Sequence, residues 1–300
     1  MSILSVRNVV KKYQDFLAVD HVSFEMPKGS ILGLLGPNGA GKTSLIRIIT
    51  TITQADAGTI LFDGEALNLN HPGQIGYLPE ERGLYKKMKV GEQLIYLARL
   101  KGLKSHQAKE EIGKWLHEFE MEDWWDKKIE ELSKGMQQKV QFVSTIVHGP
   151  KLIILDEPFS GLDPINTNLM KKQIRLLNES GTSVIFSTHR MEQVEEICEY
   201  IVLINGGKNI LDGIVTDIKN DYKDHIFHYQ FSGEFPAHLL SQIDVRERNN
   251  GSLIAHLPDT SVANQFMKQL MDSGLTITAF SEMLPTLNDI FIKKVTEENG

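Results

Sequence analysis

This chain of 300 residues has a single cysteine, no excess of basic residues and no long apolar run. Cys198 is the only cysteine, so neither an intrachain disulfide nor a cysteine zinc site can form, which fits a reducing compartment. The formal charge of −7 argues against a general nucleic-acid binder, because such proteins need a basic surface. No apolar run approaches the ~20 residues of a membrane span, and residues 1–10 lack the apolar region of a cleavable signal peptide. If the protein works at a membrane, another chain must cross it.

A glycine-rich loop with a lysine is the most informative pattern in the sequence, and it has the spacing G-x-x-x-x-G-K-[ST]. The loop reads Gly36, Pro37, Asn38, Gly39, Ala40, Gly41, Lys42 and Thr43, followed by Ser44. It joins an apolar strand predicted over 31–35 to a helix predicted over 44–50, which is the context that the motif requires. Glycines let successive backbone N–H groups face a phosphate, and the helix N-terminus adds positive potential there. Lys42 can then reach the β- and γ-phosphates, and the Thr43 hydroxyl can bind Mg²⁺.

A second motif places two carboxylates at the end of a buried strand. Four apolar residues, 152–155, are followed directly by Asp156 and Glu157. Ligands of open α/β sheets bind at the carboxyl ends of the strands. Asp156 is therefore predicted to hold Mg²⁺, directly or through water, and Glu157 to polarise the water that attacks the γ-phosphate.

The order of elements predicts an α/β fold with a second, smaller domain. Strands alternate with helices up to about residue 215, which implies a largely parallel sheet covered by helices, with a helical subdomain at about 88–148. The polar stretch 219–224 reads as a linker, so the domains are predicted at 1–219 and 220–300. Beyond the linker the order β-α-β-β-α-β matches the ferredoxin-like pattern of a small α+β domain.

These motifs together resemble the nucleotide-binding subunits of ATP-binding-cassette (ABC) transporters over about residues 1–215. The resemblance implies a P-loop NTPase domain and an ATPase coupled to transport, with ATP and Mg²⁺ bound. It assigns Tyr13 to stacking on adenine, His189 to the switch histidine and Asp163 to the loop after the second carboxylate. The segment 132–138 resembles the family signature, and its predicted contacts with ATP come from Ser133, Lys134, Gly135 and Met136.

The signature segment also has a physical meaning of its own. Ser133 and Gly135 precede a helix predicted to start near Met136, and a helix N-terminus with a serine hydroxyl is a site for an anion. In the family this second anion site faces the ATP of the partner subunit. The resemblance therefore implies a head-to-tail homodimer with two composite sites.

Two departures from the family pattern affect the expected site. Lys134 and Met136 replace the usual first glycine and glutamine of the signature. Glu80 replaces the family's central glutamine after the strand predicted over 75–79. Glutamate still binds a metal or water, so Glu80 is grouped with Thr43 and Asp156 as a predicted metal ligand; the alternative is a solvated surface loop at 80–82.

Two segments resemble the subgroup of two-component exporters that includes sodium and drug efflux. They are residues 79–85, with the apolar pair Leu84 and Tyr85, and residues 284–291. The family docks its integral membrane permease subunit beside this first segment. The resemblance thus implies a cytoplasmic protein, peripheral on the inner face of the cell membrane, that powers export of an unnamed substrate.

Three rival functions stay open at this point. The first is a soluble ABC ATPase acting on a non-transport machine, which the acidic balance and the single cassette disfavour. The second is a nucleotide sensor without hydrolysis, against which the pair Asp156 and Glu157 argues. The third is a metabolite-binding protein that works through its C-terminal domain, which fold analogy alone cannot establish. No nucleic-acid partner is expected.

Overall fold

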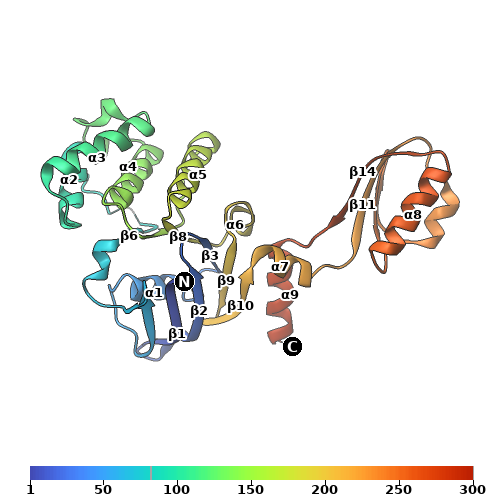
Figure 1. The fold of residues 1–300 in the computed structure, drawn as a ribbon, viewed down its shortest axis with the longest axis horizontal. Coiled ribbons are helices and arrows are strands. Elements are labelled where there is room, and N and C mark those ends of the chain that lie inside the picture. Colours follow the sequence, from blue (N-terminus) through green and yellow to red (C-terminus); the bar gives the residue numbers. More distant parts are fainter. Residues whose placement is uncertain (82, 300) are drawn as a thin grey trace. The chain divides into compact units, whose positions relative to one another are not determined.

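A computed structural model describes residues 1–81 and 83–299, and the chain divides into two compact units, Met1–Val215 and Thr216–Gly300 (Figure 1). Arg82, part of the loop predicted to contact the membrane subunit, lies outside the described residues. The structural division falls four residues before the domain boundary predicted from composition. We describe each unit by itself.

The first unit is organised around a largely parallel sheet with the order β10-β9-β3-β8-β7-β6. Its strands are β3 (Ile31–Leu35), β6 (Ile75–Leu78), β7 (Leu152–Asp156), β8 (Ser183–Thr188), β9 (Tyr200–Asn205) and β10 (Lys208–Ile214). Every residue of β3, β7 and β8 is buried, as expected for parallel strands covered on both faces. Only β10 pairs antiparallel, with β9, among the described strand pairs of this sheet. The central prediction of a parallel α/β sheet is confirmed.

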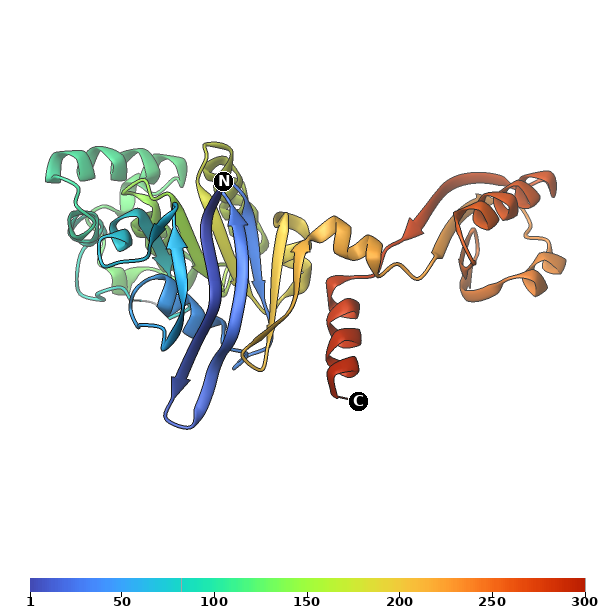
Figure 2. The same ribbon diagram turned by 60° about the horizontal axis from the view of Figure 1, so that its bottom comes forward.

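An antiparallel sheet with the order β2-β1-β4-β5 lies beside the parallel one. Its strands are β1 (Ser2–Tyr13), β2 (Phe16–Pro27), β4 (Ala57–Phe62) and β5 (Glu65–Ala66). Figure 2 shows β1 and β2 as a long hairpin. One buried apolar cluster joins this sheet, the parallel sheet and helix α1 (Lys42–Ile49), as seen in the contacts of Phe62, Leu34 and Ile46. The glycine-rich loop is thereby anchored to the main core.

Three helices form the subdomain that was predicted at about 88–148. They are α2 (Val90–Leu100), α3 (Ser105–Glu118) and α4 (Lys134–Ile146), grouped at one side of the sheets in Figure 1. Short 3₁₀ turns occupy His71–Gln74, Glu122–Trp124 and Ile129–Glu131. Helix α4 begins at Lys134, close to the predicted start near Met136, and the Ser133 hydroxyl caps it by accepting a hydrogen bond from the Met136 N–H.

Two further helices of the first unit follow β7 in the sequence and pack against the parallel sheet. They are α5 (Pro164–Glu179) and α6 (Met191–Ile197), and α7 (Val215–Asp221) follows at the division between the units. The prediction of a linker over 219–224 is wrong for its first part, since residues 219–221 complete α7. Strand β10 was not predicted, because Lys208, Asn209 and Gly213 break the alternation of apolar and polar residues that marks a strand. Its backbone is extended because it pairs with β9.

The second unit is an antiparallel four-stranded sheet with the order β12-β13-β11-β14. Its elements are β11 (Ile226–Ser232), the 3₁₀ turn Ala237–Gln242, β12 (Asp244–Asn249), β13 (Ser252–His256), α8 (Thr260–Asp272), β14 (Thr276–Met283) and α9 (Leu287–Asn299). The predicted order β-α-β-β-α-β is present, with a 3₁₀ turn in the place of the first helix. Phe227, Tyr229 and Phe266 lie in one aromatic core, and the Tyr229 hydroxyl donates to the Ala263 carbonyl over 2.9 Å.

Truncation after Asp224 tests whether the first unit works alone. The glycine-rich loop and both carboxylates lie in Met1–Val215, a unit with its own buried core. We expect residues 1–224 to fold and to bind ATP within about threefold of the full chain, measured by titration of a fluorescent ATP analogue. Circular dichroism controls for folding. A folded truncation that binds no ATP would contradict the assignment of ATP binding to the first unit alone.

Candidate nucleotide site

The backbone of the loop between β3 and α1 requires glycine at two positions. Gly36 has φ 145° and Gly41 has φ 110°, which are conformations that L side chains rarely adopt. A Cβ built on Gly36 would lie 2.1 Å from the Ile204 carbonyl oxygen, and one on Gly41 would lie 2.2 Å from the Ala18 carbonyl oxygen. The loop is therefore held tightly against its neighbours, and its residues 38–44 line a cavity of about 310 Å³.

Lys42 is drawn into the loop that precedes it. The residue is only 8% exposed, and its Nζ donates to the carbonyl oxygens of Gly36 (2.6 Å) and Pro37 (3.0 Å). Burial lowers the pKa of Lys42, while the charges of Asp156 and Glu157 act to raise it. The nearby carboxylates thus offset only part of the cost of burying the Lys42 ammonium. A charged donor of this kind favours the binding of an anion.

Asp156 ends β7 inside the same cavity and is 4% exposed. Its Oδ1 accepts a hydrogen bond from the Ser187 hydroxyl of β8 at 2.7 Å. Burial raises the pKa of Asp156 above its usual range; Glu80 and Glu157 act in the same direction, and the Ser187 hydrogen bond opposes them. A cation beside Asp156 would stabilise its charged form.

The donor set fits a magnesium ion that is completed by phosphate and water. The Thr43 residue and the carboxylate-bearing residues Glu80, Asp156 and Glu157 all line the cavity. Among residues 1–81 and 83–299, no group of three or more histidine, cysteine or acidic side chains is arranged to hold a metal by itself. Mg²⁺ commonly takes one or two carboxylates and fills its other positions with phosphate oxygens and water. The cavity therefore suits a metal that arrives with a nucleotide.

Glu157 is held in an uncommon conformation by the strand beside it. Its φ is 48°, in the left-handed region, and its N–H donates to the Ser187 carbonyl at 2.9 Å. Its Oε2 accepts from the Thr188 hydroxyl at 3.1 Å, and its Oε1 accepts from the His189 N–H at 2.9 Å. The His189 Nδ1 lies 2.7 Å from the same Oε1. The predicted pair of Glu157 and His189 is thus brought into direct contact.

The loop that carries Glu80 is tied to the helical subdomain. Glu80 lines the cavity, whereas Gln141 of α4 donates through Nε2 to the carbonyls of Pro79 (3.3 Å) and Glu81 (3.5 Å). Glu80 and Glu81 are both exposed, so Glu80 lines the cavity from a solvated loop, and its role as a metal ligand stays a prediction. Nothing in the sequence pattern singled out Gln141, because its partners are about sixty residues away.

The aromatic side chain that lines the cavity is Phe16, at the start of β2. Tyr13 was the aromatic predicted to stack on adenine; it is 40% exposed, pairs with Phe16 across the hairpin and is not among the residues that line the cavity. Phe16 is 62% exposed, so its ring is accessible to a base that enters the cavity. An aromatic on each side of a two-residue turn was the signal that could have indicated Phe16.

The signature residues do not lie at this cavity. Ser133 and Lys134 are exposed at the N-terminus of α4, and Gly135 and Met136 are partly buried in its first turn. None of the four is among the cavity-lining residues. The structure therefore separates the two predicted anion sites of one chain.

The loop after Glu157 is held by one local cap and by one contact with the signature helix. Asp163 caps α5, since its Oδ1 accepts from the Asn166 N–H at 2.9 Å, and this bond lowers its pKa. Gln138 of α4, 3% exposed, donates through Nε2 to the Pro158 carbonyl at 3.0 Å. Gln138 was not predicted as a site residue, and it joins the signature helix to the segment that follows the second carboxylate.

Two family models match the chain. One, described as "ABC transporter", matches residues 19–160, and the other, described as "ATP-binding protein DrrA1-3-like, C-terminal domain", matches residues 213–295.

Curated relatives match over nearly the whole chain. An uncharacterized ABC transporter ATP-binding protein, YhaQ of Bacillus subtilis (strain 168), is 42% identical over 98% of both chains. The Nod factor export ATP-binding protein I of Burkholderia thailandensis is 30% identical over 98% of this chain and 97% of its own. The sequence similarity therefore extends through both units.

Solved structures match about three quarters of the chain. An ATP-binding subunit of an ABC transporter has a TM-score of 0.69 at 28% identity, over 74% of this chain and 93% of its own. A cassette solved in its ADP conformation has a TM-score of 0.65 at 26% identity, over 72% and 92% of the two chains.

Replacement of Lys42 tests the anion site. Lys42→Ala removes a buried charged donor, so we expect ATP binding about 10- to 100-fold weaker, the range of one hydrogen bond to a charged group, with turnover abolished. The matched control is Lys268→Ala on α8, an exposed lysine of the second unit. Isothermal titration and phosphate release measure the two effects, and unchanged binding in Lys42→Ala would sink the assignment.

Replacement of the two hairpin aromatics separates their roles. Stacking of a base on an aromatic ring is worth about 1–3 kcal/mol. Replacing the ring that contacts adenine with alanine should therefore weaken ATP binding about 5- to 100-fold. We expect this loss in Phe16→Ala, which lines the cavity, and a smaller one in Tyr13→Ala. The reverse ranking would assign the stacking to Tyr13 alone.

Proposed function

The chain belongs to the family of ABC transporter ATP-binding proteins, and on this premise we propose how its residues perform the work. It is an ATPase subunit that drives transport. The observation that carries the residue assignments is one cavity lined by the glycine-rich loop, Asp156 and Glu157.

ATP is the nucleotide that we assign to this cavity. Residues 36–44 would surround its phosphates with backbone N–H groups, and Lys42 would move its ammonium from the loop carbonyls to the β- and γ-phosphates. Tyr13 and Phe16 would offer aromatic surface to the base. Thr43, Glu80 and Asp156 would hold Mg²⁺, which neutralises charge that develops on the phosphates.

Hydrolysis would proceed by attack of water on the γ-phosphorus, with release of ADP and phosphate. Glu157 would orient this water and accept its proton, since an anionic acceptor near the nucleophile favours that transfer. His189, half exposed beside the Glu157 carboxylate, would turn toward the γ-phosphate when nucleotide is present. The Thr188 hydroxyl and the His189 N–H keep Glu157 in place before that step.

We assign the signature residues to the nucleotide of a second copy. Ser133, Lys134, Gly135 and Met136 stand at an exposed helix N-terminus that is not part of the chain's own cavity. Such an end attracts phosphate, and the Lys134 ammonium strengthens the attraction. Two copies arranged head to tail would thus complete two sites, with Asp163 at the interface between them. Fold neighbours include a dimeric bacterial ABC transporter cassette with a TM-score of 0.65 at 21% identity, covering 71% of this chain and 98% of its own, a likeness of fold alone.

The transport partner would be a separate integral membrane permease, and the direction of transport would be export. Among the described residues no helix is long and apolar enough to cross a membrane. Some relatives are named for export, the Nod factor protein among them. The chain would therefore act at the inner face of the cell membrane, with the 79–85 segment as the contact to its partner.

A single variant and a double variant together test the composite site. Glu157→Gln keeps the shape of the side chain but removes the anionic acceptor, so hydrolysis should fall by about 10²-fold or more while ATP binding persists. The variant should then accumulate as an ATP-bound dimer in light scattering with Mg-ATP. Adding Ser133→Arg should abolish that dimer, because a bulky side chain would fill the anion site at the α4 N-terminus.

The matched control adds Ser273→Arg to Glu157→Gln, at an exposed serine after α8 in the second unit, and it should leave the dimer intact. A monomeric Glu157→Gln protein at saturating Mg-ATP, or a dimer that survives Ser133→Arg, would refute the shared site.

A further inference from the structure

The sheet of the second unit has two edge strands that differ in charge. Strand β12, with the sequence DVRERN, carries four charged residues among six, whereas β14, with the sequence TITAFSEM, carries one among eight. Charged side chains on an edge strand keep other strands from pairing with it. The β12 edge is therefore protected against pairing with another chain, and the β14 edge is not.

Strand β14 presents an extended backbone with one free side. Among the described strands it pairs only with β11, and Figures 1 and 2 show it as a long, curved strand of the second unit. The N–H and C=O groups on its other side have no strand partner. Threonine, isoleucine and phenylalanine favour an extended backbone and make up half of its residues. The edge is thus a template for a further strand.

The aromatic core of the second unit holds β14 in place. Phe280 points to the face of the sheet that α8 covers, where its ring stacks on Phe227 at 5.9 Å and lies 5.0 Å from the ring of Tyr229. The exposed side chains of the regular strand share the opposite face, and they are Ala279, Ser281 and Met283. A partner at this edge would therefore meet small or apolar side chains rather than charges.

The single charged residue of β14 already has partners within its own unit. The Glu282 Oε1 lies 3.1 Å from the His225 Nδ1, and its Oε2 lies 3.6 Å from the Lys223 Nζ. Lys223 compensates the charge of this carboxylate before any partner arrives. A second strand can thus approach β14 without burying an unpaired acid.

A bulge decides which part of β14 can pair regularly. Ala279 faces Gln230 of β11, and Ile277 faces the next residue, Phe231, so Thr278 is an extra residue in β14. A bulge interrupts the hydrogen-bond ladder. The regular part of the strand is therefore 279–283, and its middle residue is a serine.

This regular part is complementary to a second copy of itself. Two antiparallel copies centred on Ser281 place the two serines opposite each other and Ala279 opposite Met283 of the other copy. Glu282 then lies opposite Phe280, so the two acids do not face each other directly, which would be unfavourable. The pairing uses the free edge of both copies, so the assembly closes at two.

The size of the contact indicates which partner can use it. A strand pair of five residues, 279–283, buries far less than the roughly 1,200 Å² of a stable interface. The edge would therefore hold a freely diffusing protein only weakly, and it suits a strand that is already kept nearby. A second copy, brought there by the composite nucleotide sites, meets this condition.

We propose that β14 pairs antiparallel with β14 of a second copy, about Ser281, and joins the two second units into one continuous sheet. The choice of partner rests on the proposed function, and the contact goes beyond it. The pairing needs no nucleotide, because β14 belongs to the second unit and the nucleotide cavity to the first. When the composite sites are empty, the copies keep one contact, which raises the effective concentration of each half-site for the other.

A cysteine at the centre of the pairing tests it in the full chain without nucleotide. Ser281→Cys places two thiols opposite each other, and Cys198 is buried, so the new thiol is the accessible one among the described residues. Thiols held in a contact react at an effective concentration of about millimolar, so at micromolar protein the disulfide-linked dimer should form about 10-fold faster than in a control. That control is Asn249→Cys, exposed on β12, and non-reducing gels measure both rates.

Opposite charges at the same position test the register. Ser281→Lys alone and Ser281→Glu alone put like charges opposite each other, whereas a mixture of the two variants puts a lysine opposite a glutamate. We expect a zero-length carbodiimide crosslinker to join position 281 of the two copies in the mixture, as identified by mass spectrometry. A mixture of Asn249→Lys and Asn249→Glu should give no such product at position 249. Circular dichroism and ATP binding should match the wild type, because Ser281 is exposed and lies outside the nucleotide cavity.

The outcomes separate this pairing from the proposed function. A disulfide at position 281 that forms no faster than at position 249, or that needs Mg-ATP, would overturn the pairing. In membranes that hold the chain with its transport partner, a disulfide from position 281 to any other protein would rule out a second copy as the occupant. Failure of Glu157→Gln to dimerise in Mg-ATP counts against the composite sites, whereas the nucleotide-free disulfide reports on β14 alone.

Discussion

One lysine ammonium faces three carboxylates in the nucleotide cavity, and the arrangement of the site depends on this imbalance. Lys42 stands against Glu80, Asp156 and Glu157. Water screens its interaction with Asp156 least, because both of these residues are buried, whereas Glu80 is exposed. A triphosphate placed there adds further negative charge. Binding therefore requires the backbone N–H groups of the glycine-rich loop together with a divalent cation between the phosphates and Asp156.

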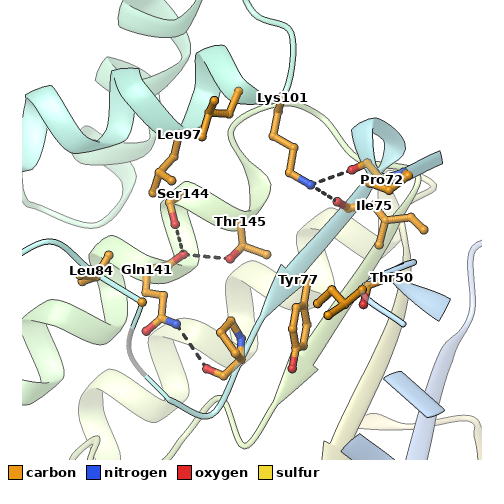
Figure 3. A pocket seen from close by; sticks show the side chains of 14 residues that line it. Thr50, Pro72, Ile75, Tyr77, Leu84, Leu97, Lys101, Gln141, Ser144 and Thr145 are labelled. Carbon is orange, nitrogen blue, oxygen red and sulfur yellow. Dashed lines mark hydrogen bonds between the residues drawn. The ribbon is translucent and has the colours of Figure 1, made fainter. Parts of the chain in front are cut away.

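Helix α4 connects the elements that must respond to nucleotide. Its N-terminus carries Ser133 at the exposed anion site, while Gln138 holds the segment after Glu157 and Gln141 holds the Glu80 loop. Gln138, Gln141 and Thr145 follow one another at helical spacing, so one buried face of α4 contacts the segment after Glu157, the Glu80 loop and a second cavity, which Tyr77 and Lys101 also line (Figure 3). A small rotation of this helix would change all three surroundings together.

Much of the fold was predictable because its signals are local. The buried strands at 31–35 and 152–156 and the helices of the subdomain follow from apolar periodicity within short windows. Predictions were wrong at a helix end and at a strand that depends on its partner. Residues 219–221 continue a helix where composition suggested a linker, and β10 forms because β9 offers it an edge for pairing.

By itself the sequence determined the glycine-rich loop, the strand that ends in Asp156 and Glu157, and the family to which they point, because each is a contiguous pattern. Only the tertiary structure decided which side chains complete the site. Ser187 reaches Asp156 from the neighbouring strand β8, and Phe16 lines the cavity from a hairpin in which the family resemblance pointed to Tyr13. Lys101 reads in the sequence as an ordinary surface lysine at the end of a helix. Its ammonium is partly buried and donates to the carbonyl oxygens of Pro72 and Ile75 only because the sheet edge folds against it, and such a contact has no trace in local sequence.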